Sequence, residues 1–339
     1  MAGARVGTVL AGLRAGLCAG LLACASLGPA QAQPTPFAEA RDNLWWGDFA
    51  ALEKQYGEIV RTNPRTSSGV PHLQRFRRGI DSVAEGNAKL TDAYFLEQEN
   101  LTLGWARANP RSPLAHVLHA WALLARGWAF RGTGYANTVP PQAWADFHRH
   151  VRRATDYLMA HADVALSDSS GHERLLAIGR VAGWDRARIW AIARDGLSRN
   201  PDDDELYLQA ARALLPKWNG DAVQLDRYIQ DASEHAHARH GPSMYARLYA
   251  LASYEQFEHQ LFQESGADWS RMKVGFEHLV MRWPDADNHN RFAYFACLAK
   301  DKPAFLDQLE KLGPRPALDF WGGNARRTFE TCKRWAQQQ

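Results

Sequence analysis

Apolar residues recur every three or four positions along most of this chain, and an Asn-Pro or Trp-Pro pair interrupts the pattern four times. That period is typical of an amphipathic α-helix. A proline cannot continue the helix before it but fits the first turn of the next, so each pair marks a boundary between helices. The four pairs are Asn63-Pro64, Asn109-Pro110, Asn200-Pro201 and Trp283-Pro284.

The composition agrees with this pattern. Alanine accounts for about one residue in six of the 339, whereas valine and isoleucine together account for about one in eighteen. Alanine favours helices, and β-branched residues favour strands. We therefore expect an all-α fold, with helices at 37–62, 71–84, 89–108, 112–130, 141–163, 171–182, 184–199, 202–215, 221–240, 243–264, 269–283, 289–300, 302–312 and 317–336.

Short turns between these helices predict that they pair as hairpins of the tetratricopeptide kind. The segments Leu44–Glu53 and Gly183–Ala187 each place a Gly, an Asp and an aromatic residue where such a turn would lie. The prolines at the four boundaries are 46, 91 and 83 residues apart, which is not a regular period. We expect degenerate repeats stacked into a right-handed superhelix; the alternative is a helical domain without repeats.

The N-terminal segment is predicted to be an export signal. Arg5 and Arg14 precede an apolar stretch, and Ala30-Gln31-Ala32 offers the small residues that a signal peptidase reads. We expect a signal peptide at 1–32, a linker at 33–36 and a single helical domain at 37–339, in the periplasm or secreted. Alternatively, Leu21–Cys24 resembles a lipobox, which would make Cys24 the lipid anchor of an outer-membrane lipoprotein.

Length and charge argue against a transmembrane segment and against a nucleic-acid partner. The apolar stretch of the leader spans about 13 residues, whereas a membrane-spanning helix takes about 20, so we expect no transmembrane segment. Beyond the leader, 38 basic residues balance 37 acidic ones, because Arg5 and Arg14 are the only charged residues before position 33. A nucleic-acid partner would demand a concentrated basic face, so we expect none.

Removal of the leader would leave two cysteines, Cys297 and Cys332. In an oxidising compartment they could form a disulfide. The alternative is that Cys297 is a small buried apolar residue with no partner. The sequence leaves both open.

Three segments resemble a bacterial family known only as domain of unknown function 4034. They are Ala122–Gly132 with Tyr135, Leu215–Gly220, and Asn288–Asp301. The resemblance covers about Trp45 to Trp321. It implies an exported protein of helical repeats and brings no assigned activity with it.

Catalytic and metal-binding motifs are weak. His235, His237 and His240 do not share a helix face, so we interpret them as a solvated helix end, and His116 and His119 lack a third ligand. Ser270–Lys273 fits a Ser-x-x-Lys nucleophile pattern without its companion motifs, and Glu255 and Glu258 are interpreted as solvated charges. We expect no catalytic residues, no metal and no cofactor.

The Gly-rich loop after position 130 is the predicted binding region, because loops carry function more often than packed helices. Arg126, Arg131 and Tyr135 could present guanidinium groups and a ring to a partner. Trp218 and Asn288, from the second and third segments above, complete the predicted set. The alternative is that both arginines only cap the end of the preceding helix.

These observations favour a non-catalytic scaffold that binds a protein or a peptide in the bacterial envelope. Stacked helix hairpins create extended binding surfaces. The alternative is an envelope enzyme, or the helical accessory part of one, in cell-wall turnover. An enzyme should show a polar pocket with converging titratable side chains.

Overall fold

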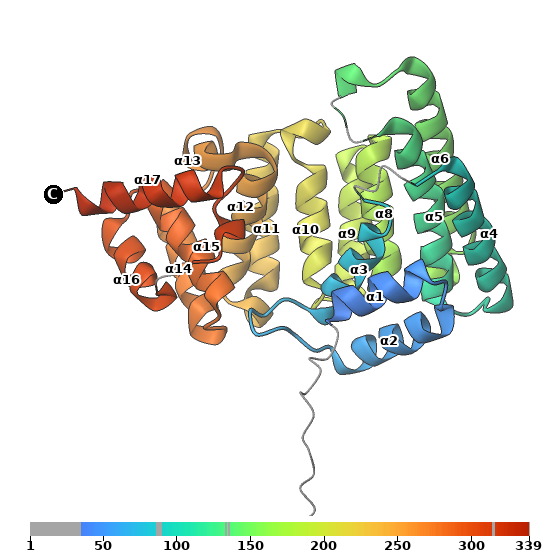
Figure 1. Cartoon of the computed structure of the whole chain (residues 1–339), viewed down its shortest axis with the longest axis horizontal. Helices are drawn as coiled ribbons and strands as arrows, with labels where there is room; N and C mark the ends of the chain where they lie inside the picture. Colours follow the sequence, from blue (N-terminus) through green and yellow to red (C-terminus); the bar gives the residue numbers. More distant parts are fainter. Residues whose placement is uncertain (1–34, 86–89, 133, 135, 314–315, 339) are drawn as a thin grey trace, which may run out of the picture. The chain divides into compact units, whose positions relative to one another are not determined.

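The protein is described by a computed structural model for residues 35–85, 90–132, 134, 136–313 and 316–338, and helices dominate these residues (Figure 1). No β-strand occurs among them, so the predicted all-α class is confirmed. The α-helices are α1 (Pro36–Trp45), α2 (Phe49–Thr62), α3 (His72–Ser82), α4 (Asp92–Ala108), α5 (Pro113–Arg131), α6 (Pro141–Ala160), α7 (Ala162–Ala165), α8 (Ser169–Ala182), α9 (Arg186–Arg199), α10 (Asp204–Ala213), α11 (Ala222–His240), α12 (Ser243–Ala252), α13 (Leu261–Glu264), α14 (Trp269–Arg282), α15 (Ala286–Leu298), α16 (Lys302–Leu312) and α17 (Ala325–Gln337).

Short polar side chains begin many of these helices by accepting hydrogen bonds from free backbone N–H groups. The acidic run before α10 shows how this works. The Asp203 side chain accepts a hydrogen bond from the backbone N–H of Glu205 at 3.0 Å, which caps the helix. Asp204 then becomes the first residue of α10 and is fully buried.

Three long helices of the sequence prediction are broken, which corrects their boundaries. The helix expected at 317–336 is α-helical only from Ala325, because Gly322 before it adopts a φ of 79°. The helix expected at 37–62 stops at Trp45, because Gly47 adopts a φ of 68° and Asp48 caps a new helix through the N–H of Ala51. The helix expected at 243–264 leaves the α conformation after Ala252. Its next residues form a π turn that ends at Glu258, whose φ is 45°.

Neighbouring helices along the chain also contact each other in space. Figure 1 shows α8 to α12 side by side in chain order, and α4, α5 and α6 pack in the same way. Among the residues that the structure describes, apolar side chains form three buried clusters, one over α1–α5, one over α5–α8 and the largest from Leu176 to Ala336.

The disulfide that the sequence left open is present. Cys297 of α15 and Cys332 of α17 are bonded, and their Cα atoms lie 5.8 Å apart. Both residues are buried in the largest apolar cluster. The bond therefore ties the last helix to the rest of that cluster.

Helix α3 rests on α8 and α10 through buried polar contacts. The Arg77 guanidinium pairs with Asp203 at 2.8 Å and donates to the hydroxyls of Ser169 and Ser170. Nearby, Arg174 of α8 pairs with Asp81 of α3 at 3.0 Å. These contacts hold the middle and the end of α3 against α8 and the start of α10, and the loop that joins α2 to α3 leads into this fixed helix.

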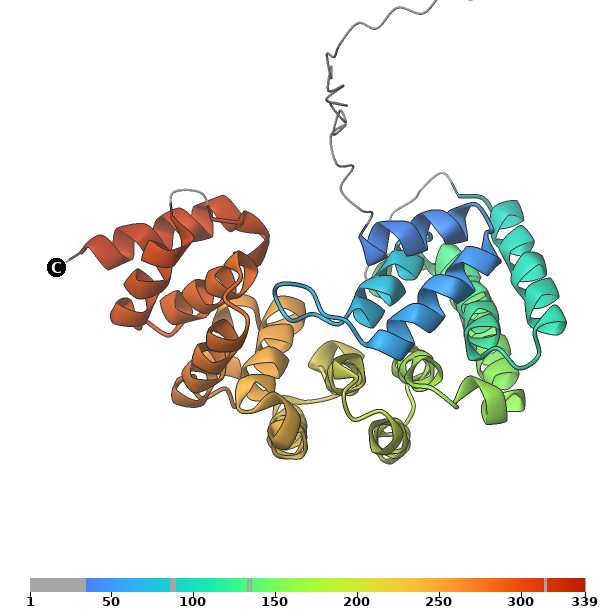
Figure 2. The same cartoon turned by 90° about the horizontal axis from the view of Figure 1, so that it is seen from below.

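That loop, residues 63–71, extends away from α2 and α3 toward helices late in the sequence (Figure 2). Asn288 of α15 donates a hydrogen bond to the carbonyl of Ser68 at 3.1 Å, across 220 residues of sequence. Gly69 lies so close to Trp283 that a Cβ there would come within 2.7 Å of the indole ring. The loop and α15 therefore form one wall of the site described next.

Within the described part of the chain, no helix combines the length and the apolar character needed to cross a membrane.

Candidate functional site

A pocket of about 380 Å³ lies where the 63–71 loop meets α10, α11, α12, α14 and α15. Its lining is mixed: apolar side chains such as Leu208, Leu251 and Leu279 alternate with charged ones. Six arginines and one acidic residue line it. They are Arg65, Arg212, Arg239, Arg247, Arg282 and Arg291, with Asp202 as the acid.

Asp204 holds two of these arginines from behind the pocket. One of its carboxylate oxygens accepts from Arg65 at 2.8 Å and from Arg247 at 2.6 Å. Burial alone would raise the pKa of Asp204, but Arg247 and Arg65 lower it well below its usual range. The carboxylate is therefore charged at neutral pH and fixes one arginine of the loop and one of α12.

Arg212 is held in the same way from the other side. It forms ion pairs with Glu205 and with Glu255, the latter at 2.7 Å. Burial alone would lower the pKa of Arg212, but the two carboxylates raise it. The guanidinium stays protonated and has little freedom to move.

The ends of α11 and α14 bring two further arginines to the pocket. Arg239 and Arg282 occupy the last turns of these helices, where the dipole of each helix favours a cation. Arg239 pairs with Asp202 at 3.0 Å. Arg282 donates to the carbonyl of Arg239 at 3.0 Å, which joins the two helix ends.

Two histidines line the pocket with nitrogen atoms that have no hydrogen-bond partner. They are Nε2 of His240 and Nδ1 of His278, and both atoms are buried. Burial lowers the pKa of both imidazoles; for His240, Asp204 opposes this effect from 3.4 Å without a hydrogen bond. Both rings are therefore neutral at pH 7.

Of the five residues predicted to bind a partner, Asn288 lies in this pocket. Its side chain is fully buried and donates to the carbonyls of Ser68 and Trp283, and its oxygen accepts from Arg291 at 3.2 Å. Asn288 therefore positions the loop and an arginine of the pocket.

The other predicted residues that the structure describes do not line this pocket. Arg126 pairs with Asp92 and Glu99 of α4, which does not match the capping alternative. Arg131 donates to the carbonyls of Gly132 and Gly134 just after α5, which is close to that alternative. The guanidinium carbon of Arg180 lies over the ring of Trp218, 5.1 Å from the centroid of that ring. Tyr135, like Cys24, lies outside the described residues.

Two sequence interpretations are wrong in part. Of the histidine cluster that was expected to be a solvated helix end, His235 and His237 are exposed, but His240 is buried and packs against Tyr207 of α10. Glu255 was expected to be a solvated charge, yet it is half-buried and pairs with Arg212 and Lys217.

The lysine of the Ser-x-x-Lys pattern is engaged by an acidic side chain. Lys273 donates a hydrogen bond to Asp301 at 2.9 Å. Over the residues that the structure describes, no group of three or more His, Cys, Asp or Glu side chains could hold a metal ion.

Sequence reasoning missed the arginine pocket. The six arginines have no common spacing, and Arg212 and Arg247 lie in no motif that was singled out. The one available signal was the basic last turn of α11 and of α14, beside Gly241 and Pro284.

Comparison with known proteins adds no relative: no protein-family model, curated protein or solved structure matches the chain. The resemblance to domain of unknown function 4034 therefore stays a prediction.

Proposed function

We propose that this chain is an exported, non-catalytic scaffold of helical repeats that binds a segment of a protein or peptide in the arginine pocket. The observation that carries the proposal is the lining of this pocket of about 380 Å³, which holds six arginines and one acidic residue. Guanidinium groups form charge-assisted hydrogen bonds with carboxylate and carbonyl oxygens, so this lining favours a bound polypeptide segment.

The enzyme alternative has one point in its favour, because titratable side chains do converge on this pocket. Most of them are guanidinium groups, which stay protonated and serve poorly as general acids or bases. The hydroxyl of Ser243 donates to the carbonyl of His240 at 2.7 Å and so is engaged with the backbone. These features favour binding over catalysis.

Export is part of the proposal. The disulfide between Cys297 and Cys332 is consistent with an oxidising compartment. Mass spectrometry of the protein purified from its own cells tests this directly. We expect Gln33 as the first residue, or an acylated Cys24 if the lipobox is used; an intact leader would contradict export.

Site-specific photo-crosslinking tests the binding site. Val70, on the loop wall of the pocket, is replaced by p-benzoylphenylalanine, and the protein is irradiated in an envelope extract of the cells that make it. Val223 of α11, which is exposed and outside the pocket, serves as the matched control position. We expect a discrete cross-linked polypeptide from position 70 only. No such product, or the same product from both positions, would overturn the proposal.

A further inference from the structure

The charges around the arginine pocket do not cancel. Four of the six lining arginines have carboxylate partners, and the partners are also four in number. Arg282 and Arg291 have none within 4 Å among the described residues: Arg282 binds a backbone carbonyl, and Arg291 binds the Asn288 side chain and lies over the ring of Phe320.

The surplus is greatest on the side that a ligand would meet. Only Asp202 among the four carboxylates lines the pocket, whereas Asp204, Glu205 and Glu255 hold their arginines from behind. Asp287, one turn before Arg291 on α15, forms no ion pair with that arginine within 4 Å. The pocket therefore presents more positive than negative charge to its interior.

The two histidines leave this surplus unchanged. Nε2 of His240 lies 3.4 Å from the Asp204 carboxylate, and Nδ1 of His278 is buried, so neither nitrogen is presented to a ligand. Arg282 and Arg291 line the pocket from α14 and α15. Guanidinium groups without a carboxylate partner match a ligand that carries several negatively charged oxygens.

We propose that the segment bound in this pocket is acidic and that Arg282 and Arg291 bind its carboxylates. This inference rests on the proposed function and names the chemistry of its ligand. The apolar patch of Leu208, Leu251 and Leu279 receives the aliphatic part of the segment. A phosphorylated segment would use the same guanidiniums, so it is distinguished by experiment.

The test selects peptides from a random heptapeptide library on the purified chain and then measures the affinity of fluorescein-labelled winners by anisotropy. We expect the selected peptides to be enriched in Asp and Glu. Replacing those residues by Asn and Gln in a winner should abolish its binding. A selection of neutral or basic peptides, or no enrichment at all, would overturn the inference.

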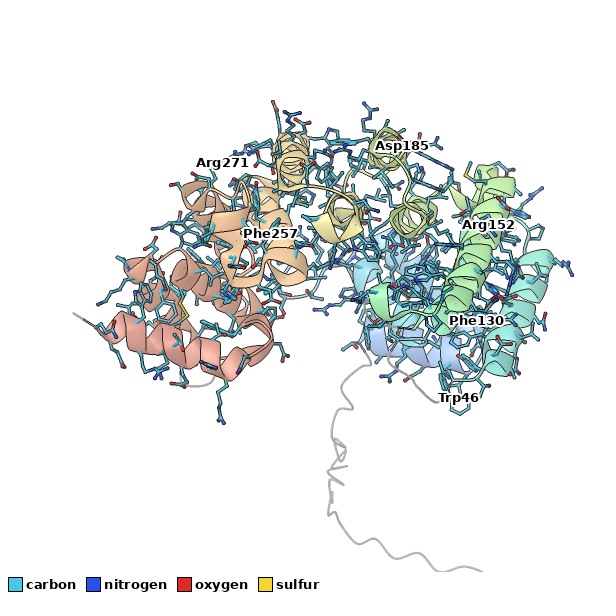
Figure 3. All side chains as sticks on the ribbon, turned by 90° about the horizontal axis from the view of Figure 1, so that it is seen from above. Trp46, Phe130, Arg152, Asp185, Phe257 and Arg271 are labelled. Carbon is cyan, nitrogen blue, oxygen red and sulfur yellow. A yellow bond between two sulfur atoms is a disulfide. The ribbon has the colours of Figure 1, made fainter. Side chains whose placement is uncertain are left out.

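Variants of the chain then locate the site. Arg282→Gln and Arg291→Gln should each weaken binding of the acidic peptide by at least about tenfold, since each removes a charge that the peptide alone would satisfy. Arg152→Gln is the matched control, because Arg152 is an exposed arginine of α6 (Figure 3). Equal affinities for all three variants would place the acidic site elsewhere and overturn the assignment.

A phosphoserine analogue of the winning peptide separates the two sources of negative charge. Tighter binding of the analogue than of the carboxylate peptide would overturn the carboxylate assignment. A cross-link from Val70 together with failed acidic selection would contradict only the charge inference, whereas failure of the cross-link would contradict the proposed function itself.

Discussion

Replacement of Asp204 by Asn probes the buried charge that organises the pocket. The side chain keeps its size but loses its negative charge, and it leaves Arg65 and Arg247 without a carboxylate. Asp204 is fully buried, so no water replaces the lost interaction on its own side.

Breaking a buried ion pair by removing one partner costs about 3–5 kcal/mol of folding stability. The side chains of Arg65 and Arg247 are 18% and 15% exposed, so water can solvate part of each guanidinium. We therefore expect a cost near the lower end, about 3 kcal/mol.

Asp202→Asn is the matched control, two residues away and with the same chemical change. Asp202 pairs with Arg239 at 3.0 Å, but its side chain is 59% exposed, and an exposed pair contributes less than about 1 kcal/mol. Urea unfolding followed by circular dichroism at pH 7 measures both variants. A loss of stability for Asp204→Asn no larger than that for Asp202→Asn would refute the reasoning.

Three further predictions concern other parts of the chain. Burial lowers the pKa of His119 to about 4 from an ordinary value of 6.5, so the unfolded chain takes up the proton first as the pH falls. The free energy of unfolding should therefore decrease from pH 6.5 to pH 4, and His119→Gln should reduce this loss by up to about 3 kcal/mol. Urea unfolding at each pH measures both. Gly69→Ala should destabilise the fold by about 1–2 kcal/mol and weaken peptide binding, since Gly69 has a φ of 79° and its new methyl would collide with Trp283; an unchanged urea midpoint would contradict this. Reduction of the bond between Cys297 and Cys332, which are 35 residues apart, should cost roughly 3–4 kcal/mol of folding stability. Dithiothreitol should therefore lower the urea midpoint of the parent chain, and a Cys297→Ser/Cys332→Ser variant should show the same lower midpoint without dithiothreitol.

The helices were predictable because their signals are local. The apolar period of about 3.6 and the helix-ending prolines both act within a few residues of the positions they determine. Asp203 and Asp285 cap helices just after the predicted boundaries at Asn200-Pro201 and Trp283-Pro284. The turn at Gly47 lies within the predicted Leu44–Glu53 turn segment, although the helix bounds ran across it. The break at Ser253 was missed because apolar periodicity continues across it.

The pocket was not predictable from such signals. Its walls come from the 63–71 loop and from residues near 240 and 290, and the bond between Ser68 and Asn288 spans 220 residues. Nothing in the local sequence of Arg65 or Arg247 reveals that both share Asp204. The Arg126–Arg131 segment attracted the prediction instead, because its glycines and cations form a visible local pattern, although the two arginines bind carboxylates and carbonyls of the same chain.

Hydrogen–deuterium exchange with and without a selected acidic peptide tests most directly that the arginine pocket is the binding site. We predict that the peptide slows exchange in the 63–71 loop and in the last turns of α11 and α14, and leaves α5 and α6 unchanged. Protection confined to residues 126–137, with none around the pocket, would contradict the account and return the binding site to the loop that the sequence favoured.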